Sequence, residues 1–190
     1  MKILFLGDVV GISGCSKLLN NLKKEIESKK IDFVIVNGEN AASQGVGLTK
    51  EICNDFFNCG VDVITTGNHV WDQKELMEYI DKEERLLRPK NLFEPAPGNG
   101  FNIYNTKQSI KIGVLNLMGN VFMKKCDDVF VEAKKFIERF KLGDGQADFI
   151  IVDMHGEITS EKMAMGYLFD GKATMVVGTH THVPTSDHRI

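Results

Sequence analysis

The sequence predicts an α/β fold, in which buried strands alternate with amphipathic helices. Short apolar runs and helical patterns follow one another along most of the chain, which favours parallel strand pairing with right-handed crossovers. A length of 190 residues suits one domain with a sizeable core, and 43% hydrophobic with 26% charged residues is typical of a globular protein. We therefore expect a single domain over residues 1–190.

The first half of the chain is expected to hold three strands, each followed by a helix. In order, these elements are a strand at 2–6, a helix at 16–30, a strand at 33–36, a helix from Thr49 to Gly60, a strand at 61–65 and a short helix at 73–80. Leu18, Leu22 and Ile26 share one face of the first helix. Thr49 suits the N-cap of the second helix, and Gly60 suits its C-terminal stop.

An irregular segment rich in proline and glycine at 88–100 precedes the second half. The elements expected after it are strands at 101–104 and 110–117 joined by a turn near Lys107, a helix at 129–140, a strand at 149–152, a helix from Ser160 to Tyr167 and a last strand at 174–177. Ser160 is expected to cap its helix.

The charge and the cysteines argue against several classes of protein. A net charge of -3 gives no sign of a nucleic-acid or membrane surface, and the lysine pairs at 23–24 and 29–30 fit solvated helix faces. The four cysteines form no C-x-x-C pair, which argues against a zinc finger or a disulfide framework. No apolar run approaches the roughly 20 residues of a membrane span, or the length of a signal peptide core. We expect a cytoplasmic protein.

Residues able to bind a metal follow the ends of five expected strands. They are Asp8, Glu39, Asn40, Asn68, His69, His155, His180 and His182. Because the carboxyl ends of parallel strands share one edge of a sheet, we expect these side chains to meet. Four of the chain's five histidines belong to this set, so chance placement is a poor explanation. His180 and His182 are two apart, which in an extended chain places both on one side.

Mixed oxygen and imidazole ligands suit Fe, Mn, Zn or Co better than Mg or Ca. Eight groups exceed the needs of one ion. Two ions that share a bridging carboxylate would use them, and such pairs serve phosphate chemistry.

Taken alone, each of these residues has a simpler structural explanation. Asp8 could be a turn or cap residue, 39–40 a helix start and 68–69 a turn, and a lone His155 is more often a satisfied buried histidine. Trp71 and Asp72 are expected to pack against and cap the following helix. No nucleotide P-loop pattern is present. The joint pattern is what favours a metal site.

The order of these motifs resembles that of the calcineurin-like metallophosphoesterase superfamily. The motifs are Gly7-Asp8, Gly38-Glu39-Asn40, Gly67-Asn68-His69, His155 and Gly178-Thr179-His180-Thr181-His182. The chain looks most like the bacterial cyclic-nucleotide phosphodiesterase branch, whose GDVVG, NGEN, GNH and GTHTH runs all occur here. That branch, like this chain, lacks the histidine of the usual D-x-H opening and has Glu39 in place of the bridging aspartate. Its members continue well past the GTHTH run, so the resemblance implies a chain that is short at its C-terminus.

The resemblance implies a metallophosphoesterase-like β-sandwich flanked by helices, with four αββα layers and an incomplete C-terminal part. It implies that Asp8, Glu39, Asn40 and His182 hold one ion, that Glu39, Asn68, His155 and His180 hold the other, and that Glu39 bridges them. Two metal ions are expected, with iron first by resemblance and manganese or zinc as alternatives. His69 would be the general acid or an electrostatic stabiliser.

The expected function is hydrolysis of a phosphodiester, with a 2′,3′- or 3′,5′-cyclic nucleotide as the small-molecule substrate. His69 would protonate the departing ribose oxygen. Two alternatives stay open: a phosphomonoesterase or protein phosphatase that uses the same ions, and a weakly active metal-binding regulator. The sequence leaves open the metal, the base and the oligomeric state, a homo-oligomer included.

Overall fold

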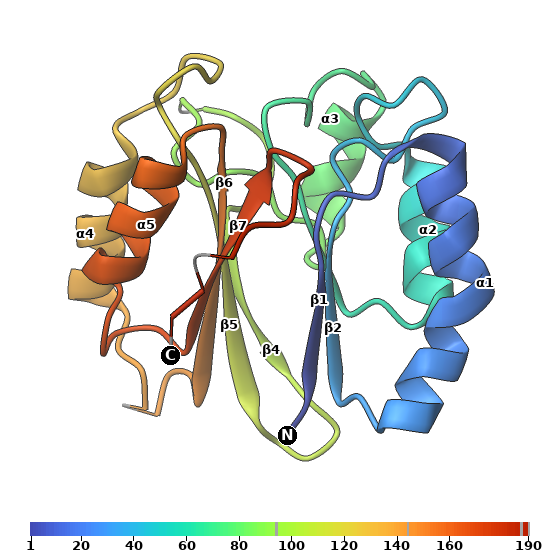
Figure 1. Ribbon diagram of the computed structural model, residues 1–190, viewed down its shortest axis with the longest axis horizontal. Helices are drawn as coiled ribbons and strands as arrows, with labels where there is room; N and C mark the ends of the chain where they lie inside the picture. The colour runs from blue at the N-terminus through green and yellow to red at the C-terminus, as the bar shows by residue number, and fades with distance from the viewer. Residues whose placement is uncertain (94, 144, 187, 190) are drawn as a thin grey trace.

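The computed structural model describes residues 1–93, 95–143, 145–186 and 188–189, and it consists of four layers (Figure 1). A three-stranded sheet of order β1-β2-β3 packs face to face against a four-stranded sheet of order β4-β5-β6-β7. Helices α1 and α2 cover the outer face of the first sheet, and α4 and α5 cover that of the second (Figure 1). The four-layer sandwich expected from the resemblance is therefore confirmed.

The first sheet is parallel throughout. Its strands are β1 (Ile3–Leu6), β2 (Phe33–Asn37) and β3 (Val63–Thr65), and its helices are α1 (Gly11–Lys29) and α2 (Lys50–Cys59). Thr49 caps α2 by accepting a hydrogen bond from the Ile52 amide, and Gly60 ends it at a φ of 111°. Both predicted helix signals are thus confirmed. A short helix α3 (Leu76–Tyr79) and a 3₁₀ turn η1 (Ile80–Lys82) follow β3.

The second sheet begins with a hairpin and continues in parallel. Its strands are β4 (Phe101–Asn105), β5 (Lys111–Met118), β6 (Phe149–Gly156) and β7 (Met175–His180), and its helices are α4 (Val129–Arg139) and α5 (Thr159–Leu168). β4 runs antiparallel to β5, whereas β5, β6 and β7 are parallel neighbours. The carboxyl ends of the parallel strands of both sheets therefore lie at the same end of the sandwich (Figure 1).

Several expected boundaries were wrong, among them the strand expected at 149–152, which extends to Gly156 and so includes His155, and the helix expected at 73–80, which spans Leu76–Tyr79. Helix α1 begins at Gly11, five positions before 16, because the Gly11 amide is held by the Asn40 carbonyl at 2.8 Å, a contact that apolar periodicity does not reveal. Ser160 lies inside α5, whose N-cap position is Ile158 without a side-chain hydrogen bond. The last strand extends to His180, so it includes the first histidine of the GTHTH run.

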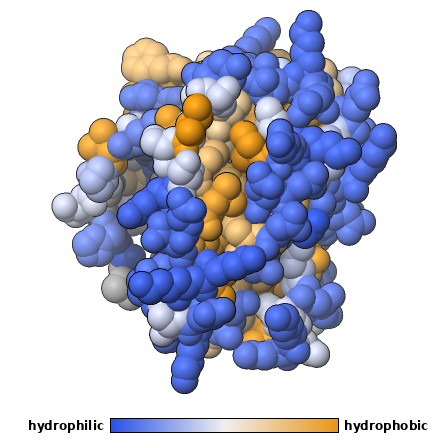
Figure 2. All heavy atoms as spheres, turned by 90° about the vertical axis from the view of Figure 1, so that its right-hand side faces the viewer, coloured by the Kyte–Doolittle hydropathy of each residue, from blue (hydrophilic) through white to orange (hydrophobic). Residues whose placement is uncertain are grey.

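Apolar packing between the layers fixes the sandwich. Phe33 and Ile35 of β2 meet Val114 of β5 and Ile151 of β6 between the two sheets. The face carrying α1 and α2 is mostly hydrophilic, apart from a strip of apolar side chains (Figure 2). The lysine pairs at 23–24 and 29–30 are exposed, as predicted. No helix in the described ranges is long and apolar enough to cross a membrane.

Candidate metal centre

The predicted ligands come from the carboxyl ends of strands in both sheets. Asp8 follows β1, Glu39 and Asn40 follow β2, and Asn68 and His69 follow β3. From the other sheet, His155 lies within β6, His180 ends β7, and His182 comes two residues later. The structure brings most of these side chains into direct contact with another member of the set. The two exceptions, Asn40 and His69, are described below.

The centre of the cluster is the Nε2 atom of His155, whose side chain is fully buried. It lies 3.0 Å from Glu39 Oε1, 3.1 Å from Asn68 Oδ1 and 3.2 Å from His180 Nδ1. One imidazole nitrogen has one proton or one lone pair, so it cannot satisfy three partners at once. Glu39, His155 and His180 each offer a ligand atom, and these atoms all lie within 4.8 Å of one another. This is the geometry of side chains that converge on one cation.

A second contact group lies beside the first. His182 Nε2 is 3.0 Å from Asp8 Oδ2, and the His180 backbone amide donates to Asp8 Oδ1 at 3.3 Å. The Asp8 side chain is 3% exposed, whereas that of His182 is 41% exposed. His180 belongs to the first contact group and His182 to the second, and the two residues are only two positions apart in the chain.

The two histidines of the GTHTH run do not share one side of an extended chain, so that expectation was wrong. His180 has a φ of 94° and His182 a φ of 52°, both in the left-handed region. This conformation is uncommon outside glycine and costs of order 1–3 kcal/mol, and it clusters at functional sites. It turns the His180 ring towards Glu39 and His155 and the His182 ring towards Asp8.

Asn40 contributes a buried oxygen without a partner. Its Nδ2 donates to the Gly45 carbonyl at 2.9 Å, which fixes the orientation of the amide. Its Oδ1 has no hydrogen-bond partner within the described residues. An orphaned buried acceptor costs about 1–3 kcal/mol, so such an atom calls for a ligand. Asn40 is close to the cluster in the chain and its backbone pairs with Val10, just after Asp8.

Electrostatics couple Glu39 to His155. Burial acts to raise the pKa of Glu39, but the hydrogen bond and charge of His155 outweigh it and leave the pKa below its ordinary value. Burial acts to lower the pKa of His155, but Glu39 outweighs it and leaves that pKa raised. For His180, burial and the neighbouring His155 both lower the pKa. A metal at this centre would replace the proton that the pair shares.

His69 belongs to the rim of the cluster. Its backbone amide donates to Glu39 Oε2 at 3.1 Å, and its Nδ1 lies 2.6 Å from Asp72 Oδ2. Asp72 also accepts from Lys124 Nζ at 3.1 Å. Asp72 therefore orients the His69 ring and does not cap α3, whose N-cap position is Glu75. The predicted capping role was wrong because a spacing of three residues also lets a carboxylate reach a histidine.

Gly67 leaves the space that the cluster needs. A Cβ atom there would lie 2.2 Å from the Nε2 and Cδ2 atoms of His155 and 2.4 Å from Glu39 Oε2. Both neighbours are buried, so neither side chain has room to move. The turn after β3 therefore requires glycine for close approach.

We expect Gly67→Ala to weaken Mn²⁺ binding at least tenfold and to lower the free energy of unfolding by about 1–3 kcal/mol, because the new methyl group overpacks the cluster. Calorimetric titration and urea unfolding measure both effects. Gly166→Ala is the matched control, since a Cβ at Gly166 of α5 meets nothing within 4 Å. Unchanged Mn²⁺ affinity in Gly67→Ala would show that the cluster is not the metal site.

Two further residues near the cluster were missed by sequence reasoning. Glu157 Oε2 lies 3.1 Å from His180 Nε2, on the side of the ring away from His155. Asp153 lies in β6 two residues before His155 and is buried. Burial raises the pKa of Asp153 to about 6, and His155 together with hydrogen bonds from Thr179, Thr65 and Asn37 limits that rise. An aspartate inside an apolar strand was the available signal for Asp153.

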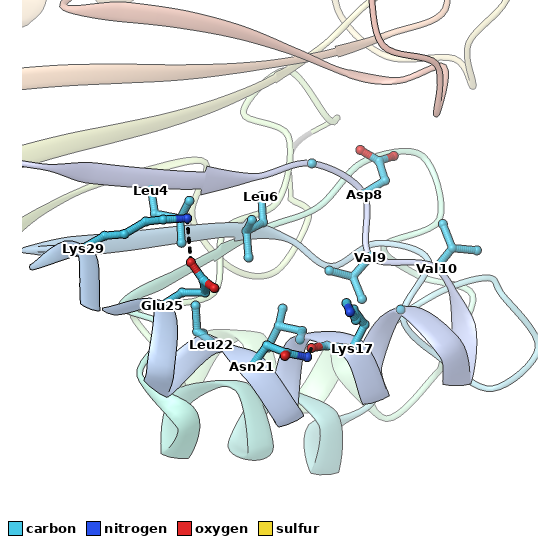
Figure 3. Close-up of a pocket in the computed structure, with 13 residues that line it drawn as sticks. Leu4, Leu6, Asp8, Val9, Val10, Lys17, Asn21, Leu22, Glu25 and Lys29 are labelled. Carbon is cyan, nitrogen blue, oxygen red and sulfur yellow. Dashed lines mark hydrogen bonds and ion pairs between the residues drawn. The ribbon is translucent and has the colours of Figure 1, made fainter. Parts of the chain in front are cut away.

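An apolar groove lies beside the cluster and shares only Asp8 with it. The groove has a volume of about 430 Å³ and runs between β1 and α1. Figure 3 shows Leu6 and Val9 pointing towards α1, whereas the Asp8 carboxylate points away from the helix. The Glu25–Lys29 ion pair lies at the other end of the groove. The candidate metal ligands therefore face a different side of the β1 tip.

The sandwich and the donor set at its edge define a metallophosphoesterase-like protein of the calcineurin-like superfamily. Carboxylate, carboxamide and imidazole groups form a donor set that fits transition metals, and the orphaned Asn40 oxygen and the glycine space at 67 fit the same interpretation. The chain belongs to the family described as YmdB-like protein, which matches residues 4–190.

Relatives and solved structures agree with this assignment. The whole chain is 43% identical to 70% of the 2′,3′-cyclic-nucleotide 2′-phosphodiesterase of Bacillus subtilis. It is 37% identical to 67% of a putative phosphatase/phosphodiesterase of Mycoplasma pneumoniae. A crystal structure of a hypothetical protein from Thermus thermophilus superposes with a TM-score of 0.89 at 38% identity, over 98% of this chain and 70% of that one. A structure titled as a novel phosphatase of Mycoplasma pneumoniae also gives 0.89 at 38% identity, over 100% and 67%.

Proposed function

We propose that this protein is a metal-dependent phosphodiesterase that hydrolyses cyclic nucleotides. The observation that carries the proposal is the convergence of Glu39, Asn68 and His180 on the Nε2 atom of His155, at an edge where both sheets deliver ligands. The identity of 43% to a 2′,3′-cyclic-nucleotide 2′-phosphodiesterase supports a phosphodiester substrate. The name of that relative supports the 2′,3′-cyclic form as the first substrate to test.

The contacts support two ligand groups, and the family resemblance assigns Glu39 to both. Glu39, Asn68, His155 and His180 would hold one ion, and Asp8, Glu39, Asn40 and His182 the other. The left-handed turns at His180 and His182 support this division, because they aim the two rings at different carboxylates. Iron is favoured by the family resemblance, and manganese and zinc accept the same mixture of oxygen and nitrogen ligands.

Bound ions would supply a water of lowered pKa and neutralise charge on the phosphoryl oxygens. The chain's own residues provide orientation and proton transfer. Asp72 accepts from the Nδ1–H of His69, so Nε2 is the ring atom left to reach a substrate. With a second proton on Nε2, the His69 ring would give that proton to the departing ribose oxygen and keep its Nδ1–H on Asp72, a general-acid role suited to histidine. Glu157 would hold the His180 ring from the side opposite His155.

A substrate panel on Mn²⁺-loaded protein tests the proposal. We expect hydrolysis of 2′,3′-cyclic AMP, weaker or no hydrolysis of 3′,5′-cyclic AMP, and faster cleavage of bis-p-nitrophenyl phosphate than of p-nitrophenyl phosphate. Asp8→Asn with His182→Ala provides an inactive control that keeps the other contact group. Protein that binds Mn²⁺ but cleaves none of the diesters would contradict the proposal and favour a metal-binding regulator.

A phosphomonoesterase is the second candidate. It is supported by the Mycoplasma relative named as a phosphatase/phosphodiesterase and by the similar structure titled as a phosphatase. Preferential cleavage of p-nitrophenyl phosphate in the same panel would reverse the order of the two candidates.

The four cysteines are all free thiols, which supports a reducing compartment such as the cytoplasm.

A further inference from the structure

Asp153 is a buried carboxylate to which the proposed reaction gives no role. It lies in the middle of β6, is 0% exposed, and faces the other sheet. Its Oδ2 accepts from Thr65 Oγ1 at 2.6 Å and from Asn37 Nδ2 at 2.9 Å, and its Oδ1 accepts from Thr179 Oγ1 at 2.6 Å. Three donors from β2, β3 and β7 thus bind one carboxylate between the sheets.

The direction of the next hydrogen bond follows from this arrangement. Thr179 Oγ1 also lies 2.9 Å from His155 Nδ1. A hydroxyl has one proton, and an ionised carboxylate can only accept, so the Thr179 proton points to Asp153. Thr179 must therefore accept from His155, which places a proton on Nδ1. Nε2 is then the nitrogen that faces Glu39, Asn68 and His180, and its lone pair becomes available when a metal replaces the proton shared with Glu39.

We propose that Asp153 and Thr179 are positioning residues, which hold the Nδ1–H form of His155 so that its Nε2 is ready to bind a metal. This inference rests on the proposed metal role of His155. Neither residue touches the metal or the substrate; each acts through the imidazole. Ligating histidines commonly give their other N–H to such a partner, and loss of the partner typically costs 10–100-fold in metal affinity.

A purely structural role does not account for the hydrogen bonds that link Asp153, the Thr179 hydroxyl and His155. Thr65 and Asn37 alone join Asp153 to the first sheet. Thr179 lies on β7, which already pairs with β6 through the backbone, including His155 opposite Thr179. Its buried hydroxyl accepts one long contact from the first sheet, from Asn37 Nδ2 at 3.4 Å, whereas its two short contacts, at 2.6 Å to Asp153 and 2.9 Å to His155, lead to the metal-binding ring.

Asp153→Asn gives a sharp test because its amide has only one acceptor oxygen. Thr65 and Asn37 both donate to the position that Oδ2 of Asp153 occupies. The amide oxygen of the asparagine is therefore held at that position, and its NH₂ group takes the place of Oδ1 and faces Thr179. The Thr179 hydroxyl must then accept from the amide and turn its proton towards His155 Nδ1. This reverses the hydrogen bond between Thr179 and His155 and favours the tautomer of His155 that has no proton on Nδ1. The Asp→Asn change in serine-protease triads likewise favours the wrong histidine tautomer.

Metal affinity is measured by titrating Mn²⁺ into metal-free protein in a calorimeter. We expect Thr179→Val to bind one Mn²⁺ ion about tenfold more weakly and Asp153→Asn about 100-fold more weakly. Thr179→Ser keeps the hydroxyl and should stay within roughly threefold of wild type. Thr66→Val is the matched control, because it removes an equally buried hydroxyl that donates to the Leu87 carbonyl and does not reach His155.

NMR of ¹⁵N-labelled, metal-free protein gives a second readout that needs neither metal nor substrate. Wild type, Thr179→Ser and Thr66→Val should show a slowly exchanging, downfield Nδ1 proton on His155. Thr179→Val and Asp153→Asn should lose or shift it. Val and Ser variants at position 179 with equal Mn²⁺ affinity, or with the same Nδ1 proton signal, would overturn the positioning role. Wild-type protein that binds no Mn²⁺ would instead overturn the proposed function and the metal consequence drawn from it.

Discussion

Replacing His155 by alanine is expected to abolish the binding of one metal ion and to destabilise the metal-free fold. The side chain is fully buried and its Nε2 is the point on which Glu39, Asn68 and His180 converge. Its loss removes a ligand and also leaves the Glu39 carboxylate, 1% exposed, without its buried partner. Breaking a buried charged pair in this way costs about 3–5 kcal/mol. Elemental analysis after Mn²⁺ loading and urea unfolding measure the two effects.

His182→Ala is the matched comparison. The His182 ring is 41% exposed, so its loss should remove the other ion while lowering the free energy of unfolding by only about 1 kcal/mol or less. If His155→Ala does not fold, His155→Gln retains a donor for Glu39 and can replace it in the metal analysis. Two ions bound at wild-type affinity in either His155 variant would disprove the assigned ligand set.

His69→Ala is expected to lower kcat for a cyclic nucleotide about 10²–10⁴-fold while both ions stay bound. The His69 side chain contacts Asp72, and only the backbone amide of His69 contacts Glu39, a contact that alanine preserves. The leaving group of a cyclic nucleotide is an alkoxide and needs a proton. The nitrophenolate of bis-p-nitrophenyl phosphate leaves readily without one, so its cleavage should fall much less.

The comparison of the two substrates isolates proton donation from other losses. Asp72→Asn should give a smaller decrease in kcat than His69→Ala, because the imidazole remains but its orientation is less well fixed. An equal fall in the cleavage of both substrates by His69→Ala would show that His69 does not donate the proton. Loss of a metal ion in the same variant would make it a ligand instead.

The sequence was informative where local chemistry determines structure. Apolar runs located the strands, and polar residues two or three positions after the expected ends of these runs placed Asp8, Glu39 and Asn68 at one edge. Thr49 and Gly60 marked the ends of α2 because capping depends on neighbouring backbone atoms. The division into two facing sheets came from the family resemblance, since strand periodicity does not reveal which strands pair.

Contacts between distant residues could not be predicted in the same way. The left-handed φ angles of His180 and His182 turn their rings towards Glu39 and Asp8, which are far away in the chain. The Asp153–Thr179 pair depends on the pairing of β6 with β7. The position of Asp72 after His69 allowed either a helix cap or a histidine partner, and only the fold decides between them.

The central claim is that this edge of the sandwich holds two ions that phosphodiester hydrolysis requires. The most direct test is to titrate Mn²⁺ into metal-free protein while the rate of 2′,3′-cyclic AMP hydrolysis is recorded. We predict no hydrolysis before Mn²⁺ is added, and a rate that rises until two ions are bound per chain. Full hydrolysis by the metal-free protein, or a rate that saturates at one ion per chain, would contradict the claim.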